Sequence, residues 1–257
     1  MTADSPKTHL EVLRTSADRL RALVAPLDDD DLDRPAYPTE WSIADVLSHL
    51  GSGAIIQHRR MDDALAGELL PDDFAPAVWA TWNAKSARAK ADDALEADRA
   101  LIERLESLND ADRAGFHLEM GPLTFDFDGF VAIRLNEHAF HTWDIEVALD
   151  PTATIPVDVA ALVVDNLDLV ARFTGKPTDT TRTITVDTTM PARRFTIELT
   201  TDSVTFTAGA TDADADLVMP AEAFARLVYG RLDPEHTPPV ERGERALEEL
   251  RPVFPGP

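Results

Sequence analysis

Residues 134–144 have the sequence Arg-Leu-Asn-Glu-His-Ala-Phe-His-Thr-Trp-Asp, and this stretch decides how the rest of the chain is interpreted. Apolar residues around it recur at helical spacing, and side chains three or four positions apart share one helix face. Glu137, His141 and Asp144 therefore lie along one stripe, with Ile133 one turn earlier. Such a stripe faces the interior, where a carboxylate and an imidazole must pair with each other or bind a cation. The stretch predicts either a buried polar pair or a metal site.

A second segment, residues 41–50, carries a histidine at the edge of another apolar helix face. Ser42 is a favourable N-cap and Asp45 resembles the third residue of a capping box, so we expect a helix to begin here. His49 follows Val46 by three positions, beside the apolar stripe. One histidine from this helix and the Glu-x-x-x-His pair of the other could form a three-ligand site with an open fourth position, the form of catalytic zinc sites. The alternative is a polar cluster in a bundle core.

Four nearby polar residues have weaker signals. Asp144 is placed either to orient a ligand imidazole or to act as a surface acid. Asp45 lies one turn before His49 and invites the same idea, although capping already explains it. His138, which points off the polar stripe, and His58 are both predicted to be exposed.

Helical apolar spacing dominates the first 150 residues. Helices are expected over residues 8–27, 42–65, 77–108 and 129–149. Gly67 marks the end of the second helix, and residues 121–128 break the pattern before the last. Four helices of this length, joined by modest loops, predict a four-helix bundle.

The pattern changes after Asp150-Pro151, which we take as the boundary between domains at residues 1–150 and 151–257. One helix is expected over residues 155–173, closed by Gly175. Alternating β-branched residues then predict antiparallel strands. The strands cover 182–188, 194–200 and 204–208, with a fourth short strand at 216–219 and helices at 220–229 and 240–250. The fold class is therefore α+β in two domains, with a small antiparallel sheet in the second.

The composition of the chain disfavours some classes of binding partner. The formal net charge is −23, so phosphate backbones would be repelled and nucleic-acid binding is disfavoured. The sequence has no apolar run of the ~20 residues that a membrane span needs, and its first residues show no export signal. We expect a cytoplasmic monomer or weak dimer that does not bind membranes. The chain has no cysteine, so thiol chemistry would need a thiol from another molecule.

The segments WSIADVLSHL (residues 41–50) and RLNEHAFHTWDIEVAL (residues 134–149) resemble the mycothiol-dependent maleylpyruvate isomerase family. The resemblance implies a DinB-like four-helix bundle followed by a sterol-carrier-like α+β domain. Carried over residue by residue, the metal ligands of the family fall on His49, Glu137 and His141. The cofactors implied are a divalent metal, with zinc as the first choice, and mycothiol as the thiol cosubstrate.

In that family an arginine of the second domain faces the metal site and matters for activity. Arg231, which follows Gly230, is the match for it and Arg226 the fallback; the alternative role is a cation at a helix C-terminus. In WNAKSAR (residues 82–88), which is similar to a family segment, Lys85 stands where the family has an arginine. Lysine keeps the charge but lacks the planar fork that fits a carboxylate, which weakens the case for a dicarboxylate substrate.

The resemblance implies an enzyme that isomerises maleylpyruvate to fumarylpyruvate by addition of a thiolate to the cis double bond. Arg231, with Lys85, would hold the carboxylates of this anionic small-molecule substrate. Three alternatives stay open. They are a mycothiol S-transferase acting on a xenobiotic or biosynthetic electrophile, a non-catalytic binding protein with the same fold, and a metal-dependent hydrolase.

Overall fold

The computed structural model describes residues 7–38, 40–209 and 214–256 of the chain. The chain divides into two compact units, Met1–Pro151 and Thr152–Pro257. The first residues, on which the expectation of no export signal rests, lie outside the described part. Within that part, no helix is both long and apolar enough to cross a membrane.

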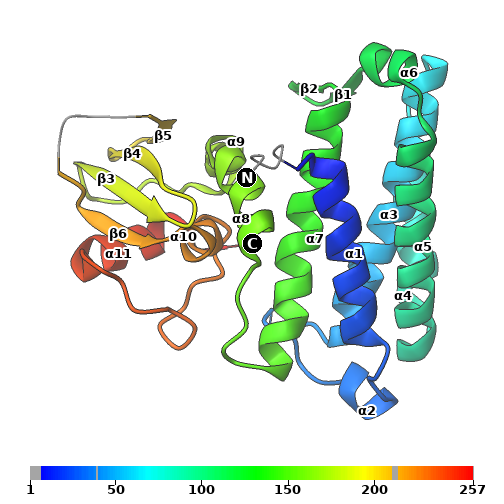
Figure 1. The fold of residues 1–257 in the computed structure, drawn as a ribbon, viewed down its shortest axis with the longest axis horizontal. Coiled ribbons are helices and arrows are strands. Elements are labelled where there is room, and N and C mark those ends of the chain that lie inside the picture. Colours follow the sequence, from blue (N-terminus) through cyan, green and yellow to red (C-terminus); the bar gives the residue numbers. More distant parts are fainter. Residues whose placement is uncertain (1–6, 39, 210–213, 257) are drawn as a thin grey trace, which may run out of the picture. The chain divides into compact units, whose positions relative to one another are not determined.

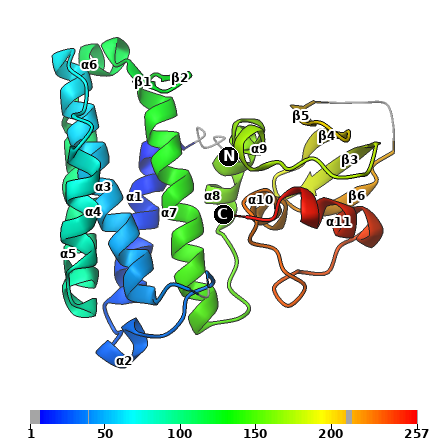
Figure 2. The same ribbon diagram turned by 180° about the vertical axis from the view of Figure 1, so that it is seen from behind.

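Four long helices form the first unit (Figures 1 and 2). They are α1 (His9–Val24), α3 (Ile43–Ala66), α5 (Ala87–Ser107) and α7 (Phe127–Leu149). Helix α1 packs against α5 and α7, and α3 packs against the same two helices. Each long helix therefore has two neighbours, and the four-helix bundle expected from the sequence is confirmed.

Local signals set the ends of the two helices that matter most for the site. The Ser42 hydroxyl accepts the backbone N–H of Asp45, whose carboxylate accepts the Ser42 N–H, so a capping box starts α3. The helix ends at Gly67, which has φ of 71° and so adopts the left-handed conformation. Asp126 caps α7 by accepting the N–H of Gly129 at 2.8 Å.

Shorter elements join the long helices. They are α2 (Asp29–Leu32), α4 (Phe74–Asn83), α6 (Asp110–Gly115) and a hairpin of β1 (Leu118–Met120) and β2 (Leu123–Phe125). The prediction of one helix over residues 77–108 is wrong, because α4 ends at Asn83 and α5 begins at Ala87. The Ser86 hydroxyl accepts the N–H of Ala89 and so caps the start of α5. This bond satisfies a backbone group that would otherwise be paired in a continuous helix, so α4 can end before α5 begins.

Close packing at one glycine brings α4 and α5 against α3. The indole of Trp82, at the end of α4, is 5% exposed and lies over Gly51. A Cβ added at Gly51 would lie 2.2 Å from Cη2 of Trp82 and 2.8 Å from Cα of Ala94 on α5. Gly51 therefore supplies the space that these helices occupy.

We expect Gly51→Ala to lower the free energy of unfolding by about 1–3 kcal/mol, the usual cost of overpacking a core. The measurement is urea denaturation followed by circular dichroism. Gly115→Ala is the matched control, because a Cβ there meets nothing within 4 Å in the described structure, and its effect should stay within about 0.5 kcal/mol. Equal stability of the two variants would contradict the packing argument.

The second unit combines short helices with a four-stranded sheet. The helices are α8 (Val157–Val163), α9 (Leu167–Thr174), α10 (Ala221–Val228) and α11 (Glu244–Leu250), with 3-10 turns η1 (Val164–Asn166) and η2 (Arg251–Val253). The strands β3 (Arg182–Thr189), β4 (Arg193–Leu199), β5 (Val204–Ala208) and β6 (Leu217–Pro220) have the order β5-β4-β3-β6. Phe195 of β4 packs 5.2 Å from both Phe206 of β5 and Phe224 of α10, measured between ring centroids. The α+β fold class is confirmed.

Three details of this unit differ from the sequence predictions. Strand β6 runs parallel to β3, since it follows a crossover rather than a hairpin and only a hairpin requires antiparallel pairing. The helix expected over 155–173 is interrupted by η1, which ends at Asn166, a weak helix former. The last helix begins at Glu244 because Gly243 has φ of 94°.

Candidate metal centre

The three predicted ligands meet between α3 and α7. His49 comes from α3, while Glu137 and His141 project from successive turns of α7. Nε2 of His49 lies 3.0 Å from Oε2 of Glu137, and Nε2 of His141 lies 3.6 Å from the same oxygen. One ligand atom from each residue falls within 4.8 Å of the other two. The arrangement brings two imidazole nitrogens and a carboxylate oxygen close enough to share one cation.

A tryptophan lies beside the two imidazoles. The ring centroid of Trp41 is 5.4 Å from that of His49 and 6.2 Å from that of His141, and the His141 ring is nearly parallel to the indole. The side chain of His141 is 11% exposed, whereas those of His49 and Glu137 are 39% and 40% exposed. The site is therefore partly open, as binding of a small molecule requires.

Asp144 orients one of the imidazoles. Its carboxylate is fully buried and lies 2.8 Å from Nδ1 of His141. An ionised carboxylate accepts a hydrogen bond from Nδ1–H, so the proton of the neutral ring stays on Nδ1 and the lone pair is on Nε2, the nitrogen that faces Glu137. The backbone carbonyl of Asp144 also accepts the N–H of Tyr37 at 3.1 Å. Asp144 thus has the geometry of a residue that supports a ligand, one of the two roles considered from the sequence.

Charges around Glu137 keep its carboxylate ionised. Partial burial raises the pKa of Glu137, but the hydrogen bond from His49 and the electrostatic interaction with His141 act in the opposite direction. Together with a contribution from Arg134, they lower the pKa to about 2. The carboxylate is therefore anionic at any physiological pH and can bind a cation without first losing a proton.

The donor set fits a divalent metal. Imidazole nitrogen and carboxylate oxygen are zinc ligands, and three protein ligands leave a coordination position for another molecule. A cavity of about 450 Å³ adjoins His49. Its lining combines two indoles with small polar side chains: Trp41, Asp45, Ser48, His49, Ser52, Trp79 and Asn83.

Asp45 does not support His49 in the way that Asp144 supports His141. Its carboxylate accepts hydrogen bonds from Ser42 and pairs with Lys90 at 2.7 Å. Its capping role is therefore the one that the described contacts show.

The predicted cations have partners of their own. Nζ of Lys85 lies 2.8 Å from the Asp93 carboxylate and 3.5 Å from the centre of a Trp82 ring. It lines a separate cavity of about 530 Å³ beside α4 and α5. In the second unit, Arg226 is 1% exposed and pairs with Glu222 at 2.8 Å. Arg231 is 7% exposed and donates to the carbonyl of Tyr229 at 3.1 Å.

The prediction that His138 is exposed is wrong, because its side chain is fully buried. It faces Asp98 of α5 and Ser16 of α1, on a side of α7 that is also packed against other helices. Sequence reasoning missed Asp98 and Arg134 as members of this buried cluster. A signal existed, since Arg134, His138 and Thr142 recur every four residues and so form a second polar stripe on α7.

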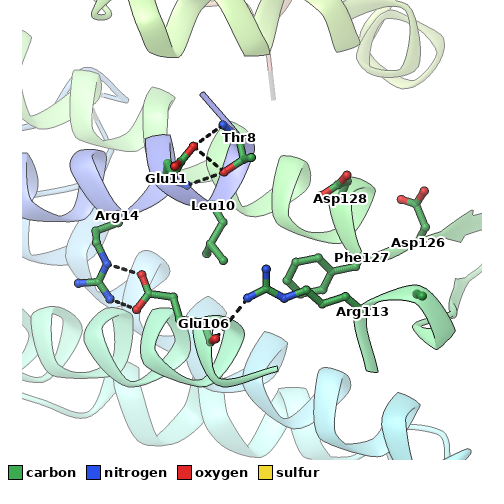
Figure 3. Close-up of a pocket in the computed structure, with 10 residues that line it drawn as sticks. Thr8, Leu10, Glu11, Arg14, Glu106, Arg113, Asp126, Phe127 and Asp128 are labelled. Carbon is green, nitrogen blue, oxygen red and sulfur yellow. Dashed lines mark hydrogen bonds and ion pairs between the residues drawn. The ribbon is translucent and has the colours of Figure 1, made fainter. Parts of the chain in front are cut away.

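Another cavity lies elsewhere in the bundle (Figure 3). It has a volume of about 820 Å³ and is lined by the start of α1, the end of α5, α6 and the start of α7. Arg14 and Glu106 form an ion pair at its wall, and Arg113 lies 5.1 Å from the ring centre of Phe127. The predicted metal ligands are not part of its lining.

Residues 13–146 match the family model of the mycothiol maleylpyruvate isomerase N-terminal domain. The chain belongs to this family. The matched range contains His49, Glu137 and His141. No curated protein matches the sequence.

Two solved structures are similar to the whole fold. They are the crystal structure of the mycothiol-dependent maleylpyruvate isomerase and that of its variant with a histidine replaced by alanine. The TM-scores are 0.63 and 0.64, at 13% sequence identity in both cases. Each comparison covers 87% of this chain and 88% of the other. At this identity the likeness concerns the fold, and it extends over both units.

We expect Asp144→Asn to weaken zinc binding by about 10- to 100-fold, the usual cost of losing a carboxylate that supports a ligand histidine. Zinc affinity is measured by competition with a chromophoric chelator, together with the unfolding temperature of the metal-free protein. Asp45→Asn is the matched control, because Asp45 lines the cavity beside His49 without bonding an imidazole, and its zinc affinity should equal that of the wild type. Similar losses in both variants would mean that Asp144 has no special relation to His141.

Proposed function

We propose that this protein is a metal- and mycothiol-dependent enzyme of the maleylpyruvate isomerase type. The observation that carries the proposal is the meeting of His49, Glu137 and His141, of which the first is 88 residues from the second in sequence. Membership of the family supports mycothiol as the cosubstrate. The proposal extends to zinc as the metal and to the cytoplasm, where low-molecular-weight thiols are kept reduced.

Each residue of the centre has a defined part in this proposal. His49 and His141 would present neutral nitrogens, and Glu137 would supply the negative charge that balances part of the dication. A divalent ion bound there would lower the pKa of an incoming thiol and keep its sulfur as a thiolate. Asp144 would hold His141 in the tautomer that binds. Trp41 would exclude water from one side of the imidazoles.

The isomerisation needs a nucleophile that adds and then leaves. The thiol sulfur forms a bond to one alkene carbon, and the electron pair of the double bond moves to the conjugated carbonyl oxygen. The carbon–carbon bond, now single, rotates, and expulsion of the sulfur restores the double bond as trans. Since the chain has no cysteine, the sulfur must come from a cosubstrate. Arg231 is proposed to hold an anionic group of the substrate and to stabilise the enolate.

A second candidate is a mycothiol S-transferase, in which the sulfur adduct is the product. The contacts of Lys85 with Asp93 and Trp82 favour it, because a lysine held in this way is a weaker partner for a substrate carboxylate. The cavity beside His49, with two indoles in its lining, also suits an uncharged electrophile. A non-catalytic binding protein with this fold is the third candidate.

Incubation of the zinc-loaded protein with maleylpyruvate and mycothiol tests the proposal. We expect loss of the cis substrate that requires the thiol, with mycothiol more effective than glutathione, because the chain supplies no sulfur nucleophile. Titration of free thiol separates the candidates: an isomerase returns the thiol, while a transferase consumes one thiol for each product formed. Full turnover without thiol would favour a hydrolase instead, and no reaction with a range of electrophiles would favour a binding protein.

A pair of variants separates metal binding from substrate binding. Glu137→Gln removes the anionic ligand, so zinc affinity should fall by at least about tenfold, a loss seen even for residues that only support ligands. Arg231→Ala should keep its zinc and lower kcat/KM. The loss should correspond to about 2–5 kcal/mol of transition-state stabilisation, the cost of truncating one partner of a buried charge pair, here the pair with the anionic substrate. Arg231→Lys should recover part of this loss.

Zinc content is measured by mass spectrometry and activity by steady-state kinetics. Wild-type kinetics for Arg231→Ala would restrict that arginine to a structural role within its own unit.

A further inference from the structure

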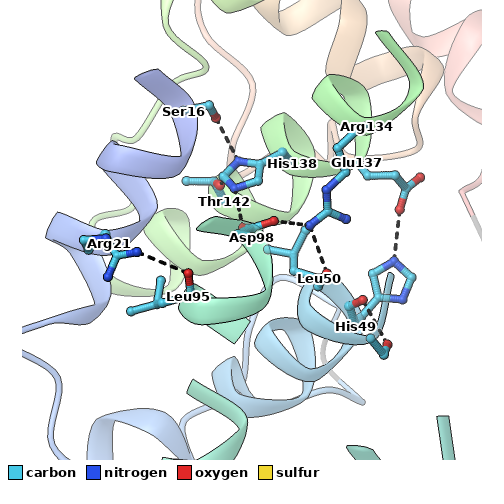
Figure 4. Close-up of polar contacts among 11 residues, drawn as sticks. Ser16, Arg21, His49, Leu50, Leu95, Asp98, Arg134, Glu137, His138 and Thr142 are labelled. Carbon is cyan, nitrogen blue, oxygen red and sulfur yellow. Dashed lines mark hydrogen bonds and ion pairs between the residues drawn. The ribbon is translucent and has the colours of Figure 1, made fainter. Parts of the chain in front are cut away.

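A cluster of buried polar side chains lies in the bundle core beside the metal centre (Figure 4). Asp98 of α5 is 3% exposed, Arg134 of α7 is 2% exposed, and His138 of α7 is fully buried. Ser16 of α1 completes the cluster, so three of the four long helices contribute side chains. None of these residues is among the predicted ligands.

The guanidinium of Arg134 crosses from α7 to α3 and α5. Its Nη2 donates to the carbonyl of Leu50 at 2.9 Å and also to the Asp98 carboxylate. Its Nη1 passes close to Gly53, where an added Cβ would lie only 3.2 Å away. Leu50 directly follows His49, so the guanidinium is bonded to the same turn of α3 that carries a ligand.

Asp98 holds the guanidinium in this position. One of its oxygens accepts from Arg134, and the other faces Nε2 of His138 at 2.9 Å. On its far side, Nδ1 of His138 lies 2.9 Å from the Ser16 hydroxyl. Burial raises the pKa of Asp98, but the charge of Arg134 and the hydrogen bonds from His138 and Arg134 hold that pKa well below its ordinary range. Asp98 is therefore ionised, and its negative charge balances the positive charge of Arg134.

A second carboxylate, that of Glu137, is close to Arg134 along the same helix. Glu137 follows Arg134 by three positions on α7, so the two side chains leave neighbouring positions on the surface of the helix. A buried guanidinium that loses its counterion is left with a large desolvation cost. Without Asp98, rotation of the arginine side chain toward Glu137 would reduce this cost, and the carboxylate would then be neutralised by arginine in place of a metal.

We propose that Asp98 is a positioning residue of the metal centre, which holds Arg134 on the Leu50 carbonyl and so keeps the Glu137 carboxylate available to the metal. This inference rests on the proposed metal site. It assigns a role to α5, a helix that supplies none of the three predicted ligands. It also distinguishes Asp98 from a carboxylate that only stabilises the fold, because its effect on the metal should act through Arg134.

The test is cobalt binding by the full-length protein and four variants. Co²⁺ affinity is measured by chelator competition, and the visible d–d spectrum reports the ligand set. Asp98→Asn should weaken Co²⁺ binding by about 10- to 100-fold and change the spectrum. The double variant Asp98→Asn/Arg134→Met should recover most of the affinity, because the competing cation is gone, and its spectrum should return toward that of the wild type.

Asp63→Asn is the matched control. Asp63 is also a buried carboxylate of the bundle, 6% exposed, and it pairs with Arg59 at 2.7 Å on the same helix. Its removal should lower the unfolding temperature and leave Co²⁺ affinity unchanged. Arg134→Lys keeps the charge but lacks the planar guanidinium whose Nη2 donates to both Asp98 and the Leu50 carbonyl, so it should bind Co²⁺ several-fold more weakly. This variant serves as the test if Asp98→Asn does not fold.

The outcomes separate this inference from the proposed function. A wild-type protein that binds no Co²⁺ and no Zn²⁺ overturns both. Metal binding by the wild type, with wild-type affinity in Asp98→Asn or in Arg134→Lys, overturns the role of Asp98 alone. A double variant that binds as weakly as Asp98→Asn also overturns it, because release of Arg134 would then not be the cause.

Discussion

Helix α7 carries ionisable side chains on one partly open face and on one buried face, and the bundle depends on each of them having a partner. One face presents Glu137 and His141 to the histidine of α3, and the other presents Arg134 and His138 to Asp98 of α5. An unpaired charge on the buried face would cost several kcal/mol. The polar contacts therefore restrict the rotation of α7 about its axis, and apolar packing fills the remaining space.

The residues of the candidate metal centre could be brought together from the sequence because much of their arrangement follows from local spacing. Glu137 and His141 are four residues apart on one helix, and His49 follows a capping box that marks the start of another. The structure brings their ligand atoms together as the shared helix face requires. The family resemblance then joined the two segments, which periodicity alone could not do.

What could not be predicted depends on contacts between distant helices. Asp98 lies at helical spacing from Ala94 and Leu101, so the apolar stripe of α5 could have marked it as buried, but its partners on α7 could not be found from this spacing. His138 was predicted to be exposed because a single polar stripe was assigned to α7, although the helix is packed on both sides. The break before Ser86 was missed because residues 77–108 keep helical spacing across it. The packing of Trp82, at the end of α4, on Gly51 of α3 is a tertiary contact that this spacing does not show.

The ligand atoms of His49 and Glu137 are contributed by residues separated by 88 positions. A metal that joins them closes a loop containing α4, α5, α6 and the hairpin, and this loop can close only after α3 and α7 have packed side by side. The ion would therefore bind the native bundle and not the unfolded chain, and the free energy of binding would add to the stability of the whole unit. The ion would thus join two adjacent helices, α3 and α7, that the polypeptide connects only through a long intervening segment. Under the proposed function, metal supply would affect the stability of the first unit as well as turnover.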